Sequence, residues 1–375
     1  MRDVLNNKIT VAGAIGICLT KKVHFAAYRL PGKTGTTLVV QKDNAVHAPG
    51  KLTDRLPEKG FLIAPFLRED NVTYLINPDM VLHEPFGSLQ LEALNVLPVK
   101  PANNDIITCP DDTGKDDYIR LIQDTIEKIN AGEFEKVVLS RVKSVPGNYT
   151  AHLAEIFQIL CSSYPNAFVY LFYVNGQCWT GATPEPFVCS REGELNTVSL
   201  AGTRPYHEKN LDIRNWNKKE LLEQEYVTLH IEKILKNYEV STFTKKGPYV
   251  TRAGNLLHLR TDFTFSTRAV GNRLPSLIHT LHPTPAVCGM STRKAMDFIR
   301  NAEKHNREYY AGFLGPVGID DLIQLYVNLR CLKVHDNRLI LYIGGGITHD
   351  SVPEEEWEET EIKADTLLSV LKQIR

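Results

Sequence analysis

The stretch SVPEEEWEETEIK at residues 351–363 continues into ADTLLSVLKQIR, and together they predict one amphipathic helix near the end of the sequence. Ser351 and Glu354 have the spacing of a capping box, and Pro353 falls in the first turn, where its missing N–H costs nothing. The second half carries an apolar stripe that predicts the buried face, at Leu367, Val370, Leu371 and Ile374.

The same stripe, extended backwards at helical spacing, meets three charged residues: Lys363, Glu359 and Glu356. Burying such charges without partners costs several kcal/mol each, so the helix predicts compensating groups inside the protein. The alternative is a glutamate-rich first turn that complements the helix dipole in water. We apply this alternative to Glu354 and Glu355 only, because a second helix repeats the pattern of Glu356 and Glu359.

The second helix is predicted at residues 217–235, NKKELLEQEYVTLHIEKIL. Its apolar stripe, extended backwards, meets Glu220 and Glu223, so two helices each carry a glutamate pair at i, i+3. Two solvated faces are the alternative. If both pairs face one cavity, a divalent cation is the simplest compensation, and a set of oxygen ligands without His or Cys favours Mg²⁺ over zinc. Because Mg²⁺ keeps waters or substrate oxygens, one glutamate per helix is enough for direct binding.

Composition excludes several classes of protein. The 375 residues carry a formal net charge of −1, which does not favour a nucleic-acid partner. The seven cysteines contain no Cys-x-x-Cys pair, which indicates thiols in a reducing compartment. The apolar run at residues 11–19 is too short to span a membrane, and we interpret it as a buried strand. We therefore expect a soluble, cytoplasmic protein without a membrane partner.

Two residues are candidates for proton transfer. Lys136 is the first residue of a β-branched run, KVVLSRVK, that predicts a strand. The lysine side chain lies either in solvent at the end of the strand or in a cavity where desolvation lowers its pKa. Glu185 lies between two prolines in ATPEP, which predicts a rigid turn whose carboxylate faces either solvent or a site. Taken singly, each residue is more often a solvent-facing one.

Other segments supply weaker signals. AGTRP at 201–205 is a turn whose small residues allow close approach of a ligand, and His258 taken alone is more often structural. Arg330 lies between apolar neighbours in the strand-like run 324–334 and is a candidate carboxylate clamp. The glycines at 344–346 lack a P-loop or dinucleotide fingerprint, although backbone amides there could bind an anion. Residues 1–98 are strand-rich and show no catalytic constellation.

Taken together, the segments resemble the chorismate-utilising enzyme family of isochorismate, salicylate, anthranilate and aminodeoxychorismate synthases. The match runs from about Asp117 to the C-terminus, and its specificity comes from order and spacing. It rests on Lys136-Val-Val-Leu-Ser-Arg141, Thr183-Pro-Glu185, Leu200-Ala-Gly-Thr-Arg204, Glu220-x-x-Glu223, His258-Leu259, Tyr310-x-Gly312, Leu329-Arg330, Gly344-Gly-Gly346-Ile347 and Glu356-x-x-Glu359-x-x-x-Lys363. The resemblance implies an α/β (α+β) fold: one large chorismate-binding domain over residues 1–375, like anthranilate synthase component I, with extended antiparallel sheets, flanking helices and a central active-site cleft.

The resemblance also implies a branch of the family. Members that add ammonia carry Gln where this chain has Lys136, and aminodeoxychorismate synthases often carry a nucleophilic Lys where it has Ala201. The stretch HPTPAVCG at 282–289 looks like that of isochorismate synthases. We therefore expect a monomeric isochorismate synthase acting on chorismate. The alternatives are a salicylate synthase and, from another class, a non-catalytic chorismate-binding protein.

Roles for individual residues follow from the same resemblance. Lys136 is expected to activate water at C2 and Glu185 to protonate the departing C4 hydroxyl. Mg²⁺ is expected on Glu223 and Glu359, with Glu220 and Glu356 holding its waters. The expected substrate-binding groups are Gly202, Thr203, His258 near the C4 hydroxyl, Tyr310 and Arg330 at the enolpyruvyl carboxylate, the backbone at Gly344 and Gly346, and Lys363, which orients the acidic cluster.

Overall fold

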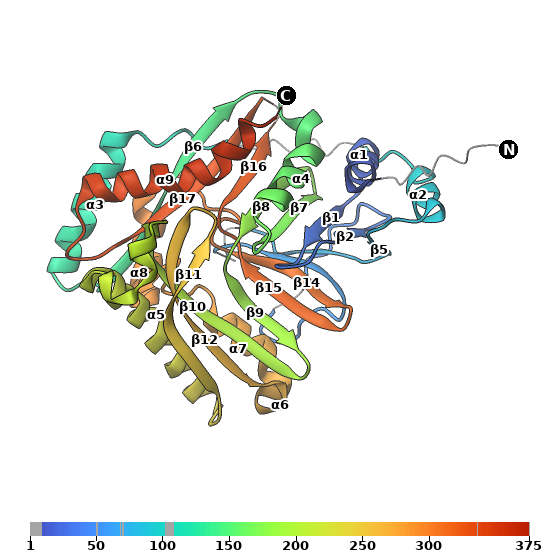
Figure 1. The fold of residues 1–375 in the computed structure, drawn as a ribbon. Helices are drawn as coiled ribbons and strands as arrows, with labels where there is room; N and C mark the ends of the chain where they lie inside the picture. Colours follow the sequence, from blue (N-terminus) through green and yellow to red (C-terminus); the bar gives the residue numbers. More distant parts are fainter. Residues whose placement is uncertain are drawn as a thin grey trace.

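Two antiparallel β-sheets organise the chain in the computed structural model, which describes residues 10–49, 52–67, 69, 71–101, 109–335 and 337–374 (Figure 1). Within those residues the first sheet has nine strands, in the order β13 (Gly289–Met290), β6 (Lys136–Pro146), β17 (Arg338–Ile347), β16 (Cys331–His335), β8 (Gln177–Thr183), β7 (Phe168–Val174), β1 (Phe25–Arg29), β2 (Thr37–Val40) and β5 (Met80–His83).

The second sheet has eight strands within the same residues. Their order is β11 (Thr244–Ala253), β12 (Leu256–Ser266), β10 (Glu194–Pro205), β9 (Pro186–Arg191), β15 (Leu322–Val327), β14 (Phe313–Ile319), β3 (Gly60–Ala64) and β4 (Tyr74–Ile76). Aromatic side chains join the facing surfaces of the two sheets: the rings of Phe168 and Tyr326 stack with centroids 4.2 Å apart. The predicted α+β fold with extended antiparallel sheets is thereby confirmed.

Helices cover the remaining faces. An apolar cluster lies between the outer face of the nine-stranded sheet and α1 (Val11–Lys21), α2 (Ser88–Asn95), α4 (Leu153–Ser163) and α9 (Pro353–Leu371). The helix α5 (Lys218–Asn237) packs on β10 and β12 and contacts α7 (Leu274–Leu281). The others are α3 (Lys115–Asn130) beside α9, α6 (Thr267–Val270) and α8 (Thr292–Ala302). No helix within the described ranges combines the length and apolar character needed to cross a bilayer.

The N-terminal strands belong to both sheets. β1, β2 and β5 complete one edge of the nine-stranded sheet, and β3 and β4 complete one edge of the other. The strands β1 to β5 therefore share the core of the later residues and do not form a core of their own.

Two of the points at which the chain crosses between the sheets lie next to each other. Pro184 and Glu185 link β8 to β9, while residues 328–330 link β15 to β16. Backbone hydrogen bonds tie the crossings together: Val327 N–H donates to the Glu185 carbonyl (3.0 Å), and Ala182 N–H donates to the Arg330 carbonyl (3.1 Å). The prediction of one continuous strand over 324–334 is therefore wrong. Both halves of the run are strands and are largely buried, but they lie in different sheets.

Two local predictions are corrected. The run at residues 11–19 forms the helix α1 instead of a strand, and its buried residues recur at helical spacing: Val11, Ala14, Ile15 and Cys18. The predicted C-terminal helix is confirmed as α9, but Ser351 does not cap it. The Ser351 hydroxyl accepts a hydrogen bond from Thr348 N–H (3.0 Å) and closes the turn before the helix.

A buried arginine fastens α9 to β6. Arg141 is 1% exposed, and its Nε donates to Thr360 Oγ1 (2.7 Å). Its guanidinium pairs with Glu361 and lies 4.1 Å from the centre of the Trp357 ring. Lys143 reaches the same Glu361 (2.7 Å) from a partly exposed position.

We predict that Arg141→Ala lowers the free energy of unfolding by about 2–4 kcal/mol, because the variant loses buried packing and leaves Thr360 without its donor. Lys143→Ala is the matched control and should cost at most about 1 kcal/mol, since its ion pair is accessible to solvent. Urea unfolding followed by circular dichroism measures both variants. Equal losses would contradict the assignment of Arg141 as the anchor of α9.

Candidate active site

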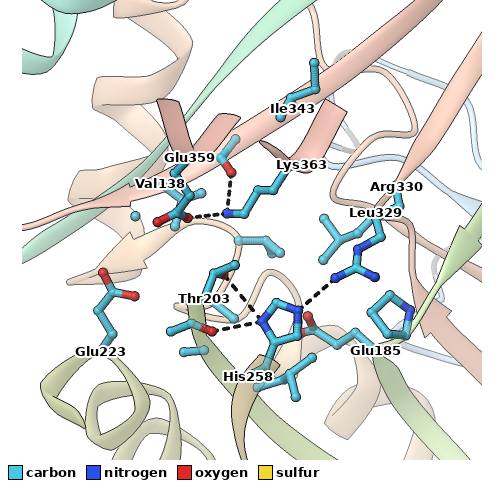
Figure 2. Close-up of a pocket in the computed structure, with 18 of the residues that line it drawn as sticks. Val138, Glu185, Thr203, Glu223, His258, Leu329, Arg330, Ile343, Glu359 and Lys363 are labelled. Atoms are coloured by element: carbon cyan, nitrogen blue, oxygen red, sulfur yellow. Dashed lines mark hydrogen bonds and ion pairs between the residues drawn. The ribbon is translucent and has the colours of Figure 1, made fainter. Parts of the chain in front are cut away.

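A cavity of about 120 Å³ lies where α5, α9, β6, β10, β17 and the two sheet crossings meet. Every predicted site residue except Glu220 and Glu356 lines it: Lys136, Glu185, Gly202, Thr203, Glu223, His258, Tyr310, Arg330, Gly344, Gly346, Glu359 and Lys363. Figure 2 shows Glu223 and Arg330 on opposite sides of this pocket. The sequence therefore identified a set of residues that the fold brings together from distant segments.

Lys136 is the first residue of β6 and is 2% exposed. Its Nζ lies 3.9 Å from Glu223 Oε2. Burial lowers the pKa of Lys136, Glu223 opposes that shift, and the neighbouring positive charges of Lys363 and Lys219 add to it. Of the two alternatives for this lysine, the structure has the buried one. A buried amine with a lowered pKa can exist in the neutral form that accepts a proton.

Glu185 lies in the first sheet crossing and is 4% exposed, so the solvent-facing alternative is wrong. Its backbone is fixed on both sides: Glu185 N–H donates to Thr183 Oγ1 (3.3 Å) and its carbonyl accepts from Val327 N–H. Burial raises the pKa of Glu185 to about 8, against the positive charges of Lys136, Arg260 and Arg330. The carboxyl group is therefore protonated over much of the neutral range and can donate a proton.

His258 and Arg330 form a hydrogen-bonded pair that lines the pocket (Figure 2). His258 Nδ1 lies 2.8 Å from the Gly202 carbonyl, which can only accept, so Nδ1 carries the proton. Nε2 then accepts from Arg330 Nη2 (2.8 Å). Burial, with the charge of Arg330, lowers the pKa of His258 to about 3, so the ring stays neutral. Both nitrogens of His258 are engaged, so its geometry supports positioning of Arg330 more than the predicted contact with a substrate hydroxyl.

Arg330 is held from two sides. Besides the bond to His258, its Nη1 donates to the Ala253 carbonyl (3.1 Å). Its backbone has φ +48°, an uncommon conformation for a residue with a side chain, and packs against Gly181. Burial lowers the pKa of Arg330 to about 10, which still leaves it charged at neutral pH. The remaining guanidinium donors suit a carboxylate.

Two carboxylates from different helices face the pocket, as predicted. Glu223 comes from α5 and Glu359 from α9 (Figure 2). Glu359 pairs with Lys363 (2.6 Å), whose Nζ also donates to the Gly344 carbonyl (2.9 Å). Lys363 therefore connects the acidic residues to the glycine-rich end of β17.

Glu220 lies outside the pocket. Its carboxylate forms a two-point ion pair with Arg204 (2.6 and 2.8 Å) and accepts from Asn217 N–H (2.7 Å) at the start of α5. At i−3 from Glu223, its side chain is rotated by about 60° around the helix and lies one turn towards the N-terminus. We therefore correct its role: Glu220 caps α5 and holds the end of β10 that contains Arg204.

Glu356 also lies outside the pocket lining, but it is 2% exposed and pairs with Lys219. Burial raises the pKa of Glu356, Lys219 opposes the shift, and the nearby charge of Glu359 adds to it. Its Oε2 atom is buried without a hydrogen-bond partner of normal geometry among the described residues. Glu356 therefore lies one helical turn before Glu359 on α9, and a Cβ atom at Gly345 would lie 3.4 Å from its Oε2 atom.

Lys219 was missed by the sequence analysis. Burial lowers its pKa, but the charges of Glu356 and Glu223 outweigh burial and raise that pKa to about 12. The sequence contained a signal for it, because Lys219 precedes Glu223 by four residues and so lies on the same side of α5.

The donor set fits a magnesium ion better than a transition metal. No ready-made group of three His, Cys, Asp or Glu ligands occurs among the residues that the structure describes. Glu223 and Glu359 nevertheless face one cavity, and the Oε2 atom of Glu356, one helical turn before Glu359, is buried without a geometric hydrogen-bond partner in the described part of the chain. Mg²⁺ needs only one or two carboxylates because waters and substrate oxygens complete its shell.

Two glycines make room for these side chains. A Cβ atom at Gly346 would lie 2.9 Å from Lys136 Cε and 3.2 Å from Glu223 Oε1. A Cβ atom at Gly344 would lie 2.7 Å from Tyr310 Oη. The glycines at the end of β17 therefore allow Lys136, Glu223 and Tyr310 to approach the same strand.

Comparison with known proteins agrees with this geometry. The family described as chorismate binding enzyme matches residues 76–372. Isochorismate synthase MenF of Bacillus subtilis (strain 168) is 27% identical over 279 residues, 72% of this chain and 59% of that protein. Isochorismate synthase MenF of Escherichia coli (strain K12) is 30% identical over 272 residues, 70% of this chain and 61% of that protein. The match thus spans about three fifths of these relatives' length.

The fold has a counterpart among solved structures. The structure of MenF, the menaquinone-specific isochorismate synthase from Escherichia coli, superposes with a TM-score of 0.77 at 21% identity and covers 98% of this chain and 92% of that one. At this identity the likeness concerns the fold. Together with the match of the family over most of the sequence, it shows that this chain belongs to the chorismate binding enzyme family.

Proposed function

We propose that the protein is an isochorismate synthase, an isomerase that adds water at C2 of chorismate and releases the C4 hydroxyl. The observation that carries the proposal is that one pocket holds an amine and a carboxyl group with opposite pKa shifts. Burial lowers the pKa of Lys136 and raises the pKa of Glu185. The names of the relatives support the same activity.

Proton transfer follows from the two shifts. Neutral Lys136 takes a proton from the attacking water, and protonated Glu185 gives one to the departing hydroxyl, so protons balance within one turnover. Each positioned group contributes roughly 10²–10⁴-fold to the rate. An amine and a carboxyl group with ordinary pKa values would both be charged at neutral pH, so burial is what makes this pair competent.

Substrate binding needs two anchoring points, because chorismate carries two carboxylates. Arg330, fixed by His258 and Ala253, would grip the enolpyruvyl carboxylate together with Tyr310. The ring carboxylate would lie towards Glu223 and Glu359. Those two residues would hold Mg²⁺, with Glu356 behind them, and the bound ion would offset the negative charge of the carboxylate.

The test of the proposal is the product formed from chorismate and Mg²⁺, resolved by chromatography. Isochorismate is expected from the wild-type chain. We predict that Lys136→Gln lowers its rate by at least about 100-fold while chorismate still binds, because only the base is lost. Calorimetric titration measures the binding.

Lys143→Gln, a lysine on the same strand outside the pocket, is the matched control and should leave the rate unchanged. Salicylate and pyruvate as products would favour the salicylate synthase alternative, and unchanged chorismate would favour a binding protein. Anthranilate formed with added ammonia would overturn the branch of the family. Isochorismate formation by Lys136→Gln would reject Lys136 as the base.

We predict that the rate falls as pH rises through about 8 or above, because Glu185 must be protonated to act and its pKa is raised to about 8. The groups that face it, Lys136, Arg260 and Arg330, all oppose that rise. A profile of kcat against pH measures the effect. In Glu185→Gln, the remaining activity should no longer fall as pH rises through this range. The same fall in rate in that variant would show that another group causes it.

We predict that activity is lost in EDTA and restored by Mg²⁺, and that Glu359→Gln weakens Mg²⁺ binding at least about tenfold, because it removes one of two carboxylates facing the pocket. Calorimetric titration of the metal provides a readout independent of turnover. The matched control is Asp365→Asn, an exposed carboxylate on the same helix, with unchanged Mg²⁺ affinity expected. Full activity after exhaustive chelation would exclude the metal.

A further inference from the structure

A second cavity of about 510 Å³ adjoins the active-site pocket on the side of Arg330. Four residues line both spaces and form the wall between them: Pro184, Leu200, His258 and Arg330. Its outer lining is exposed, at Asn166 and Arg252 for example, whereas its inner end is the buried His258. The cavity therefore leads from the surface to the wall of the active site.

The lining of this cavity is strongly cationic. Arg252, Arg260 and Arg330 contribute three positive charges, and no acidic residue lines it among those that the structure describes. Arg252 is exposed and stacks on the Tyr206 ring, with its guanidinium 3.8 Å from the ring centre. Its Nε donates to the Gly254 carbonyl (2.8 Å). The N–H groups of its two terminal nitrogens can therefore bind an anion.

A third cavity, of about 290 Å³, adjoins the active site at other residues and has the opposite charge. It shares Thr203 and Glu359 with the pocket and is lined by four carboxylates, without any lysine or arginine among the described residues: Glu354, Glu355, Glu358 and Glu359. An approaching dianion is repelled there and attracted on the arginine side.

We propose that the cavity lined by Arg252, Arg260 and Arg330 is an anion-binding vestibule through which a dicarboxylate substrate enters the active site. The proposal rests on the proposed function for the identity of the substrate. The vestibule holds a carboxylate first at Arg252 and Arg260 and then passes it to Arg330.

Arg330 is suited to receive the carboxylate because it lines both spaces. Its hydrogen bonds to His258 and Ala253 use two of the five guanidinium N–H groups and fix the plane of the group in the wall. The other donors can bind a carboxylate from either side. Entry and final binding of the substrate then share one side chain.

Arg252 is the residue to change, because Arg260 has other roles. Arg260 pairs with Asp262 (2.6 Å), which also accepts from Tyr249, and its charge acts on the carboxyl group of Glu185. Replacing Arg260 would disturb both. Arg268 provides the matched control: it is an exposed arginine beyond the other end of β12, about 35 Å from the Arg252 end at ~3.3 Å per residue.

The experiment measures the association and dissociation rate constants of chorismate by stopped flow, with Mg²⁺ present, in the Lys136→Gln background that blocks turnover. Adding Arg252→Glu should slow association on the order of tenfold at low ionic strength. Dissociation should slow by a similar factor, so that Kd changes little. The difference should vanish at roughly 1 M salt, where the Debye length is about 3 Å. Arg268→Glu should change neither rate.

The outcomes separate the two proposals. An unaltered association rate in Arg252→Glu, or an equal loss in Arg268→Glu, overturns the vestibule even if the wild-type chain produces isochorismate. A large rise in Kd with unaltered association also overturns it, because Arg252 would then contact bound substrate. A wild-type chain that neither binds nor converts chorismate rejects the proposed function, and with it the substrate assigned to the vestibule.

Discussion

Burial of opposite charges around one small cavity is the constraint on which the site depends. Lys136, Glu223 and Glu356 are buried and Lys219 is partly buried, so each of these charges needs a partner of opposite sign. The partners come from α5, α9 and β6, and a shift of any one of these elements would leave a charge uncompensated. The packing of α9 by Arg141 therefore serves the site as well as the stability of the fold.

The two sheet crossings supply the other half of the site. Strands that leave one sheet for the other expose their ends to the space between the sheets, and Glu185 and Arg330 lie at these ends. Asn328, fully buried in the second crossing, satisfies its polar atoms through Tyr170 (2.5 Å) and the Tyr309 carbonyl (2.9 Å). Glu185 and Arg330 are thus held in fixed positions by backbone hydrogen bonds and by the core.

Electrostatics links the site to its surroundings. The arginine-lined cavity and the glutamate-lined cavity adjoin the pocket on different sides, so the field across the site has a direction. Within the pocket, burial moves the pKa of Lys136 down and that of Glu185 up. The charge of Glu223 opposes the shift of Lys136, and the charge of Lys136 opposes the shift of Glu185. One low-dielectric cavity therefore tunes both groups towards neutral pH.

The sequence by itself determined the local elements and the types of chemical group. Periodicity predicted α5, α9 and β6, because periodicity depends on spacing along one element. The resemblance to the chorismate-utilising enzymes predicted which residues line the pocket. Tertiary structure decided the rest. The run at 11–19 was misassigned because a buried helix is as apolar as a buried strand. The run at 324–334 was assigned to one strand because its two halves are both strands, although they lie in different sheets. The fold brings Arg204 within reach of Glu220 and Lys219 within reach of Glu356. These ion pairs distinguish Glu220 and Glu356 from Glu223 and Glu359, which line the pocket. The spacing of residues along a helix specifies which side chains share a face, but only tertiary packing decides which groups those side chains contact.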